Sequence, residues 1–127
     1  MDKLFLVMLG GALGSGARYL VGLAANERLP GSFPWGTWIV NVVGSFAMGI
    51  VAWHATSSTP WSPATRAFVA TGVLGGFTTY SSFNQETLNY VHAEAWGSAA
   101  LYGGATAIAC LVAGFAGMAA ARSIAGS

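Results

Sequence analysis

The sequence predicts an all-α membrane protein with four transmembrane helices, the third of them broken. Of its 127 residues, 54% are hydrophobic and only 7% are charged, whereas soluble domains carry roughly 25% charged residues. About 20 mostly apolar residues are needed to cross the roughly 30 Å hydrocarbon core of a bilayer, so four spans would occupy about 80 residues. The remaining residues suffice only for short loops, and we expect a single transmembrane domain over residues 1–127.

The expected spans follow the apolar stretches along the chain, at about residues 4–25, 35–55, 64–92 and 97–121. A polar turn from Asn26 to Gly31 ends the first span, and a linker with two prolines, Thr56 to Pro63, follows the second. Ser62 and Pro63 are a typical beginning of a helix. Tryptophan gathers where membrane and water meet, and the five tryptophans mostly fall near these span ends: Trp35, Trp38, Trp53, Trp61 and Trp96.

The third expected span contains a stretch that is poorly suited to a continuous helix, GVLGGFTTYSSFNQE from Gly72 to Glu86. Glycine adds backbone entropy to the unfolded chain, threonine and serine hydroxyls compete for backbone hydrogen bonds, and β-branched side chains lose rotamer freedom. Unpaired backbone is tolerated at bilayer depth only where protein buries it or where it lines a wet cavity. The stretch therefore predicts a helix break and, beside it, an ion or solute site.

The basic residues give almost no signal for orientation in the membrane. Lys3, Arg66 and Arg122 fall on the side of the termini, while Arg28 and Arg18 fall on the other. This near balance favours insertion in both orientations, and oppositely inserted copies can pair as an antiparallel, dual-topology homodimer. Because four helices are thin walls for an aqueous path, we expect the path to form between subunits.

Composition and motifs argue against several functional classes. The net charge of +1 and its scattered basic residues argue against nucleic-acid binding. No His, Cys, Asp and Glu cluster has metal-ligand spacing, no serine has the partners of a triad, and the glycine-rich stretch lacks the lysine of a phosphate loop. We therefore predict that the protein is not an enzyme. Cys110 lies in an apolar run and is interpreted as a small packing residue.

Three polar side chains at membrane depth are candidates for function, each with a structural alternative. Asn41 lies near the middle of the second span, where its amide either donates to an anion or makes a hydrogen bond between helices. Arg18 either snorkels to the interface or lines an anion vestibule. Glu86 would be neutral or paired, and it either serves a vestibule or satisfies polar neighbours.

The break itself offers ligands for ions of both signs. Carbonyl oxygens around Gly75 suit a hard cation such as Na⁺. Tyr80 and Phe83 share a helical face, and their positive ring edges can face an anion, although such a pair more often serves core packing. Hydroxyl donors stand nearby at Thr78, Thr79, Ser81 and Ser82. Neutral donors of this kind attract an anion moderately, whereas fixed cationic ligands would risk holding it too tightly to let it leave.

In these features the chain resembles the Fluc (CrcB) family of small bacterial fluoride channels. The resemblance covers all four spans and rests on the glycine-rich start with Arg18, on GTWIVNVVGS with Asn41, on GVLGGFTTYSSFNQET, and on Tyr102 followed by a small-residue helix. It implies a fluoride-selective channel of the bacterial inner membrane that exports fluoride passively and lowers its cytoplasmic toxicity. It also implies an antiparallel homodimer with two fluoride pores and a structural, untransported Na⁺ at the interface.

The resemblance further implies roles for individual residues. The backbone carbonyls of Gly75 and Thr78 would hold Na⁺ together with their symmetry mates. The paired phenylalanines that line the family's pores fall at Tyr80 and Phe83, and the pore asparagine falls at Asn41. The rest of the expected fluoride path consists of Thr79, Ser81 and Thr106.

Two departures from the family pattern concern this path. Tyr80 carries a hydroxyl where phenylalanine is usual, and the fourth span has Cys110 and Gly114 after Thr106 where the family often continues a row of hydroxyls.

Two other functions fit part of the sequence. A small multidrug exporter also has four spans and often dual topology, but it needs a membrane-embedded acid in the first helix, where this chain has Arg18 and no acid. A non-transporting membrane assembly subunit would use the glycines and aromatic residues for packing only.

Overall fold

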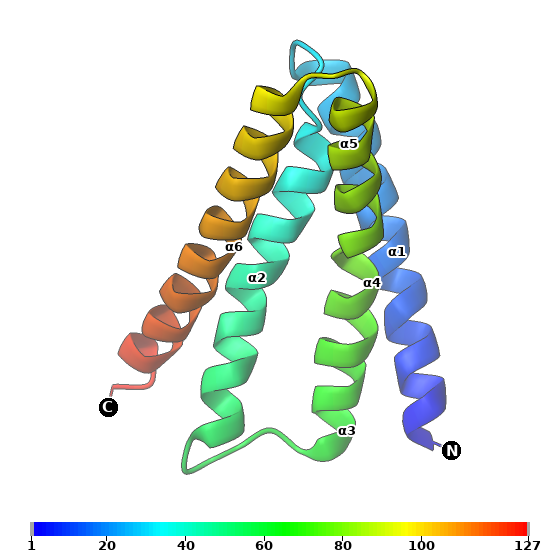
Figure 1. The fold of residues 1–127 in the computed structure, drawn as a ribbon. Coiled ribbons are helices and arrows are strands. Elements are labelled where there is room, and N and C mark those ends of the chain that lie inside the picture. Colours follow the sequence, from blue (N-terminus) through cyan, green and yellow to red (C-terminus); the bar gives the residue numbers. More distant parts are fainter. Residues whose placement is uncertain (1, 127) are drawn as a thin grey trace.

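Residues 2–126, which the computed structural model describes, form a bundle of helices joined by short loops (Figure 1). The two long N-terminal helices are α1 (Asp2–Arg28) and α2 (Trp35–Thr56), and the chain ends with α6 (Trp96–Ile124). Between α2 and α6 lies a row of shorter pieces: α3 (Pro63–Arg66), the π-helical η1 (Ala67–Leu74), α4 (Gly75–Phe77) and α5 (Tyr80–His92).

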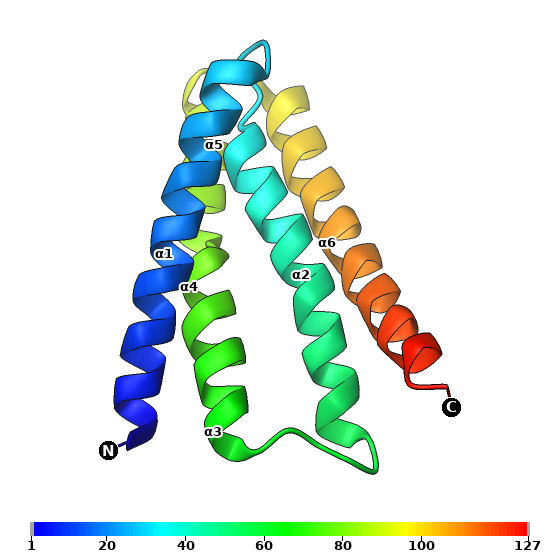
Figure 2. The same cartoon turned by 180° about the vertical axis from the view of Figure 1, so that it is seen from behind.

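The bundle has the character of a membrane protein. Within residues 2–126, three helices are long and apolar enough to cross a bilayer, namely α1, α2 and α6. This confirms the coarser prediction of an all-helical protein with apolar helices of membrane-spanning length. The segment expected as the third span is helical as well, and it runs along the whole bundle beside α1 and α2 (Figures 1 and 2), but it consists of pieces too short to be such a helix.

Thr78 and Thr79 interrupt this segment, and both have extended backbone. Their φ and ψ angles are −87° and 156° at Thr78 and −151° and 112° at Thr79. The Ser62 hydroxyl accepts a hydrogen bond from the Thr65 N–H at the segment's start, and the Thr79 hydroxyl does the same for the Ser82 N–H at the start of α5, at 3.1 Å. The segment thus contains two separate helix beginnings.

Close glycine contacts hold the bundle together in two pairs of helices. A Cβ atom on Gly14 of α1 would overlap the Val73 carbonyl oxygen of η1, and one on Gly10 would lie 2.6 Å from the Phe68 carbonyl oxygen. On α6, a Cβ atom on Gly117 would overlap the Phe46 carbonyl oxygen of α2. Each pair therefore packs backbone against backbone, as small residues allow in membrane helices.

The loops divide between the two ends of the molecule. Both termini and the loop over residues 57–62 lie at one end, where the helices spread apart, and the other two loops lie at the opposite end, where they converge (Figures 1 and 2). The break between α4 and α5 lies between these two ends.

Candidate ion site at the break between α4 and α5

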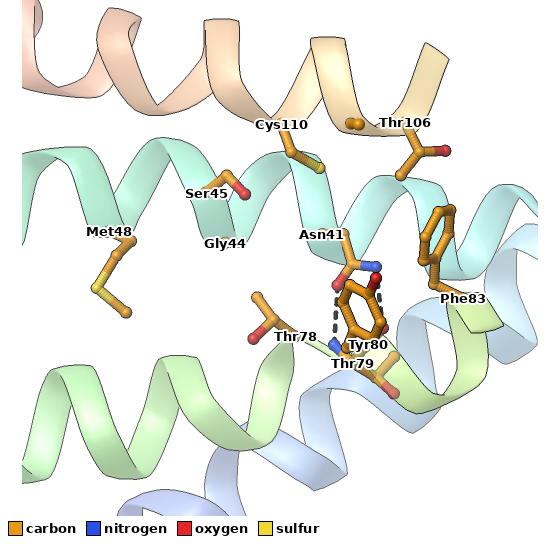
Figure 3. A pocket seen from close by; sticks show the side chains of 11 residues that line it. Asn41, Gly44, Ser45, Met48, Thr78, Thr79, Tyr80, Phe83, Thr106 and Cys110 are labelled. Atoms are coloured by element: carbon orange, nitrogen blue, oxygen red, sulfur yellow. Dashed lines mark hydrogen bonds between the residues drawn. The ribbon is translucent and has the colours of Figure 1, made fainter. Parts of the chain in front are cut away.

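A cavity of about 310 Å³ opens beside the break, between α2, α5 and α6 (Figure 3). Several of the side chains that the sequence predicts for an ion path line it, although they come from distant parts of the chain. The lining residues are Asn41, Gly44, Ser45, Met48, Thr78, Thr79, Tyr80, Phe83, Thr106, Ala107 and Cys110.

Asn41 connects α2 to the break through both ends of its amide. Its Nδ2 donates to the Thr79 carbonyl oxygen at 3.1 Å, and its Oδ1 accepts from the Thr79 N–H at 2.8 Å (Figure 3). The interhelical hydrogen bond that the sequence offered as one alternative is therefore formed. The amide NH2 group has two hydrogens, so the second remains available to a ligand.

The hydroxyls at the break are largely engaged with neighbouring protein groups. The Thr78 Oγ1 donates to the Leu74 carbonyl oxygen at 2.8 Å. The Thr79 Oγ1 donates to the Ser82 Oγ at 3.1 Å and lies 3.2 Å from the Ser81 Oγ. Ser81 is exposed and lies outside the residues that line the cavity. Thr79 borders the cavity, whereas Ser81 supports the start of α5.

The backbone carbonyls of Gly75 and Thr78 fit the requirements of a hard cation. In a continuous helix they would accept hydrogen bonds from the N–H groups of Thr79 and Ser82. Those N–H groups donate instead to the Asn41 Oδ1, at 2.8 Å, and to the Thr79 Oγ1, at 3.1 Å. Carbonyl oxygens are ligands for hard cations, and these two oxygens, left without their helical donors, are the candidate cation ligands.

Phe83 lies in a chain of aromatic rings that borders the cavity. The Tyr80 and Phe83 ring centroids are 5.6 Å apart in an edge-to-face arrangement, and Phe83 lies 5.3 Å from the ring of Tyr102. Tyr102 is 1% exposed and Tyr80 is 74% exposed. The chain of rings thus leads from the interior of the bundle to its surface, and the ring edges carry the positive charge density that attracts an anion.

Thr106 borders the same cavity and has a buried hydroxyl. The residue is 4% exposed, and its Oγ1 has no hydrogen-bond partner within residues 2–126. Cys110, one turn further along α6, also lines the cavity and a neighbouring cavity of about 280 Å³ that includes Gly114. Cys110 and Gly114, which depart from the family pattern on the fourth span, therefore lie in or next to the candidate site.

Arg18 lies outside this cavity and supports the break from the side of α1. Its Nε donates to the Gly76 carbonyl oxygen at 3.0 Å. The half-buried side chain also lines a second cavity of about 250 Å³, together with Asn26, Thr79 and Ser82.

Glu86 is paired with two hydroxyls, as one of its alternatives required. Its Oε1 accepts from the Thr37 hydroxyl and its Oε2 from the Tyr102 hydroxyl, both at 2.6 Å. The sequence did not predict that Thr37 would donate a hydrogen bond to Glu86. Its signal is its position one helical turn before Asn41, because residues four apart share a helix face.

Comparison with known proteins gives one consistent family. Residues 5–118 match the family described as "CrcB-like protein, Camphor Resistance (CrcB)". A protein of Anaeromyxobacter sp. (strain K) is 49% identical over 126 residues, covering 99% of this chain and 100% of that protein, and is named "Fluoride-specific ion channel FluC". Proteins with the same name in Caulobacter vibrioides (strain NA1000 / CB15N) and Sorangium cellulosum are 46% and 41% identical, each with 98% of both chains covered.

The relatives carry the name of an ion channel and not of an enzyme, in agreement with the prediction from the sequence. Together with the apolar helices α1, α2 and α6, they identify the chain as a multi-pass bacterial membrane protein. The chain belongs to the CrcB family.

Proposed function

We propose that the chain is a fluoride-selective channel of the bacterial inner membrane that lets fluoride leave the cell passively and so lowers its toxicity in the cytoplasm. The observation that carries the proposal is the cavity at the break, where an amide, a buried hydroxyl and aromatic ring edges gather without a basic side chain. The relatives named as fluoride-specific channels support it.

The chemistry of the cavity suits a small, strongly hydrated anion. A pore must replace the water around the ion with donors, yet the ion must also be able to leave. The second amide hydrogen of Asn41, the Thr106 hydroxyl and the ring edges of Tyr80 and Phe83 are moderate donors. Thr79 adds a hydroxyl beside the cavity, and Ser81 adds one at the start of α5. Arg18 and Glu86 lie outside the cavity, as side chains of a vestibule would.

The proposed channel is an antiparallel homodimer in which residues 63–92 form a third, broken crossing. The row from α3 to α5 extends along the whole bundle, as a crossing must (Figure 1). Tyr80 borders the cavity although 74% of its surface is exposed in the single chain, so a second copy would close the path at this side. The excess of basic residues at one end is small, which would allow that copy to insert in the opposite orientation.

The proposal includes a structural Na⁺, not transported, at the axis of this dimer. The Gly75 and Thr78 carbonyls would hold it together with the equivalent carbonyls of the second copy, because the hydrogen bonds to Asn41 and Thr79 leave both oxygens without their helical donors. When bound, the ion supplies a fixed positive charge that ties the two copies together and raises the potential near the anion path. The carboxyl-terminal end of the continuous helical run from α3 through η1 to α4 is where a cation is favoured.

A liposome flux assay tests this function. Purified protein is reconstituted into vesicles loaded with potassium fluoride, and a fluoride electrode follows efflux after valinomycin is added. We expect rapid fluoride release and no comparable release of chloride from matched vesicles. Equal chloride release would contradict the proposed selectivity. Exchange of protons for organic cations would instead indicate the multidrug-type exporter, and no transport of any kind would indicate an assembly subunit.

A further inference from the structure

We infer that Asn41 builds the cation site, because its amide takes the N–H group that would otherwise satisfy the Gly75 carbonyl. This role is separate from any contact of Asn41 with an anion. It rests on the proposed Na⁺ at the Gly75 and Thr78 carbonyls, and it names the side chains that make those two oxygens available.

The hydrogen-bond pattern changes between two consecutive carbonyls. The Leu74 carbonyl oxygen accepts from the Thr78 N–H at 3.0 Å, as in a regular helix, and from the Thr78 hydroxyl at 2.8 Å. The next N–H, that of Thr79, would bond to Gly75 if the helix continued. It points instead to the Asn41 Oδ1 at 2.8 Å. The helix therefore stops at the residue where α2 supplies a competing acceptor.

The amide of Asn41 fixes the direction of Thr79 as well as its hydrogen bond. Because Nδ2 also donates to the Thr79 carbonyl oxygen at 3.1 Å, the amide pairs with Thr79 as one strand residue pairs with another. The φ of −151° and ψ of 112° at Thr79 are those of extended backbone. Two bonds from one planar group hold this conformation more firmly than a single acceptor would.

Thr79 then frees the second carbonyl by the same means. Its Oγ1 accepts the Ser82 N–H at 3.1 Å, which a continuous helix would direct to Thr78. In contrast, the carbonyl of Gly76 is occupied, since the Nε of Arg18 donates to it at 3.0 Å. Side chains thus decide which carbonyls are open, and they leave open the two that a cation would need.

The contact between α2 and the break depends on a small residue beside Asn41. A Cβ atom on the buried Gly44 would overlap the Cγ2 atom of Thr78. Gly44 therefore lets α2 come close enough for the Asn41 amide to reach Thr79. The proposed cation site therefore depends on α2 as well as on the broken segment that carries its two ligands, Gly75 and Thr78.

A thermal-stability titration with Na⁺ tests the role of Asn41. The Tm of the purified protein in detergent is measured as N-methyl-D-glucamine is replaced by Na⁺ at constant ionic strength. A ligand that binds only the folded protein raises the Tm with its concentration. We expect this rise for the wild type, whereas for Asn41→Ala the Na⁺ concentration at half of the rise should increase by at least about tenfold.

Thr37→Val is the matched control for this titration. It removes a hydrogen bond from α2 to Glu86 of α5, one turn before Asn41 and on the same face, but it leaves Thr79 untouched. We expect a lower Tm at every Na⁺ concentration and an unchanged Na⁺-dependent rise. A general loss of stability is thereby separated from a loss of the cation site.

A second pair of variants tests the other carbonyl and covers the case that Asn41→Ala does not fold. Thr79→Val keeps the shape of the side chain but lacks the hydroxyl that takes the Ser82 N–H, so its Na⁺ dependence should weaken; Thr79→Ser keeps the hydroxyl and should behave as the wild type. A wild-type Na⁺ response in Asn41→Ala or Thr79→Val overturns the role of the substituted residue. If the wild type conducts fluoride but shows no Na⁺ response, the cation site and this inference fall together, while the channel function stands.

Discussion

At the scale of single residues, Phe83 has the most informative position in the candidate site. Its ring lies between those of Tyr80 and Tyr102, at centroid distances of 5.6 Å and 5.3 Å, and it lines the cavity. A ring held between two others has little freedom to rotate away from the cavity. In the proposed channel its edge would be a fixed, weak donor to the anion.

Replacing Phe83 with isoleucine tests whether this ring edge takes part in conduction. The variant keeps an apolar side chain of similar bulk but removes the aromatic quadrupole. We expect fluoride flux in liposomes to fall by at least about tenfold, which corresponds to ~1.4 kcal/mol on the barrier. The protein should remain folded and of unchanged oligomeric size. The control is Phe5→Ile, at a ring on α1 that is 70% exposed, and it should conduct as the wild type does. If Phe83→Ile also conducts as the wild type does, Phe83 is a packing residue.

The sequence was a good guide to which residues gather at the cavity and a poor guide to their hydrogen bonds. Asn41, Tyr80 and Phe83 were named because donors and aromatic pairs are conspicuous in an apolar chain, and Thr106 was named from the family resemblance; all four line one cavity. That Asn41 would bond to the backbone of Thr79 depends on the rotation of α2 about its axis and on its distance from the break. Neither quantity is encoded in the spacing of residues along one helix.

At the scale of elements, Glu86 connects three helices. Its carboxylate, on α5, accepts hydrogen bonds from Thr37 of α2 and from Tyr102 of α6, both at 2.6 Å. α5 contains no buried residue of its own, so these two hydrogen bonds add to the ring contact between Phe83 and Tyr102 in holding it to the bundle. A hydrogen bond to a charged group contributes more than one between neutral groups. The carboxylate therefore has a structural role whether or not it also serves a vestibule.

Tyr102→Phe measures this contribution. Removing the hydroxyl leaves one carboxylate oxygen without its donor, so the free energy of unfolding should fall by about 1.5–3 kcal/mol. Thermal denaturation in detergent, followed by circular dichroism, reports the change. Tyr90→Phe is the control. The ring centroids of Tyr90 and Tyr102 are 6.0 Å apart, but the hydroxyls that donate to Glu86 are those of Thr37 and Tyr102. A Tyr102→Phe variant as stable as Tyr90→Phe would show that the bond to Glu86 contributes little.

The glycines of α1 provide a second prediction at this scale. Gly14 lies against the Val73 carbonyl of η1, whereas nothing lies within 4 Å of a Cβ atom on Gly16. Gly14→Ala should therefore destabilise the protein by about 1–3 kcal/mol through overpacking, and Gly16→Ala should leave it equal or up to about 1 kcal/mol more stable. Melting curves of the two variants in the same detergent test this. Equal effects would mean that the close approach of α1 and η1 is not maintained.

These two glycines also show where sequence patterns stop being sufficient. Gly10 and Gly14 are four residues apart, and so are Ala12 and Gly16, so both pairs have the spacing of a close helix contact. Only the first pair faces η1, while Gly16 is exposed. The spacing identifies a helix face that can pack closely. Which of several such faces is used depends on the position of the neighbouring helix.

At the scale of the whole molecule, both termini and the 57–62 loop lie at one end (Figures 1 and 2). Lys3 near the start of α1, Arg66 at the end of α3 and Arg122 near the end of α6 therefore lie toward this end, whereas Arg28 at the end of α1 lies at the other. Orientation in the membrane follows the excess of basic residues in short loops. With Arg18 bonded to the Gly76 carbonyl at the break, the count at the two ends is three against one, and we propose that this excess of two is small enough for both orientations to be populated.

Reporter fusions at the C-terminus test the proposed dual topology. Alkaline phosphatase, active only outside the cytoplasm, and a fluorescent protein, active only inside it, should both give signal when fused after Ser127. Adding two lysines to the 57–62 loop should shift the population toward the orientation with that loop inside. Activity of one reporter alone would contradict dual topology and, with it, the antiparallel dimer.

The pairing of Asn41 with Thr79 also bears on how the chain enters the membrane. Until α2 lies alongside, the N–H and carbonyl of Thr79 have no partner in hydrocarbon, where each unpaired group costs several kcal/mol. Because α2 precedes the break along the chain and the N-terminal part of a protein emerges first, Asn41 is synthesised before Thr79. The order of the helices thus provides the partner of the Thr79 N–H and carbonyl before these groups are made.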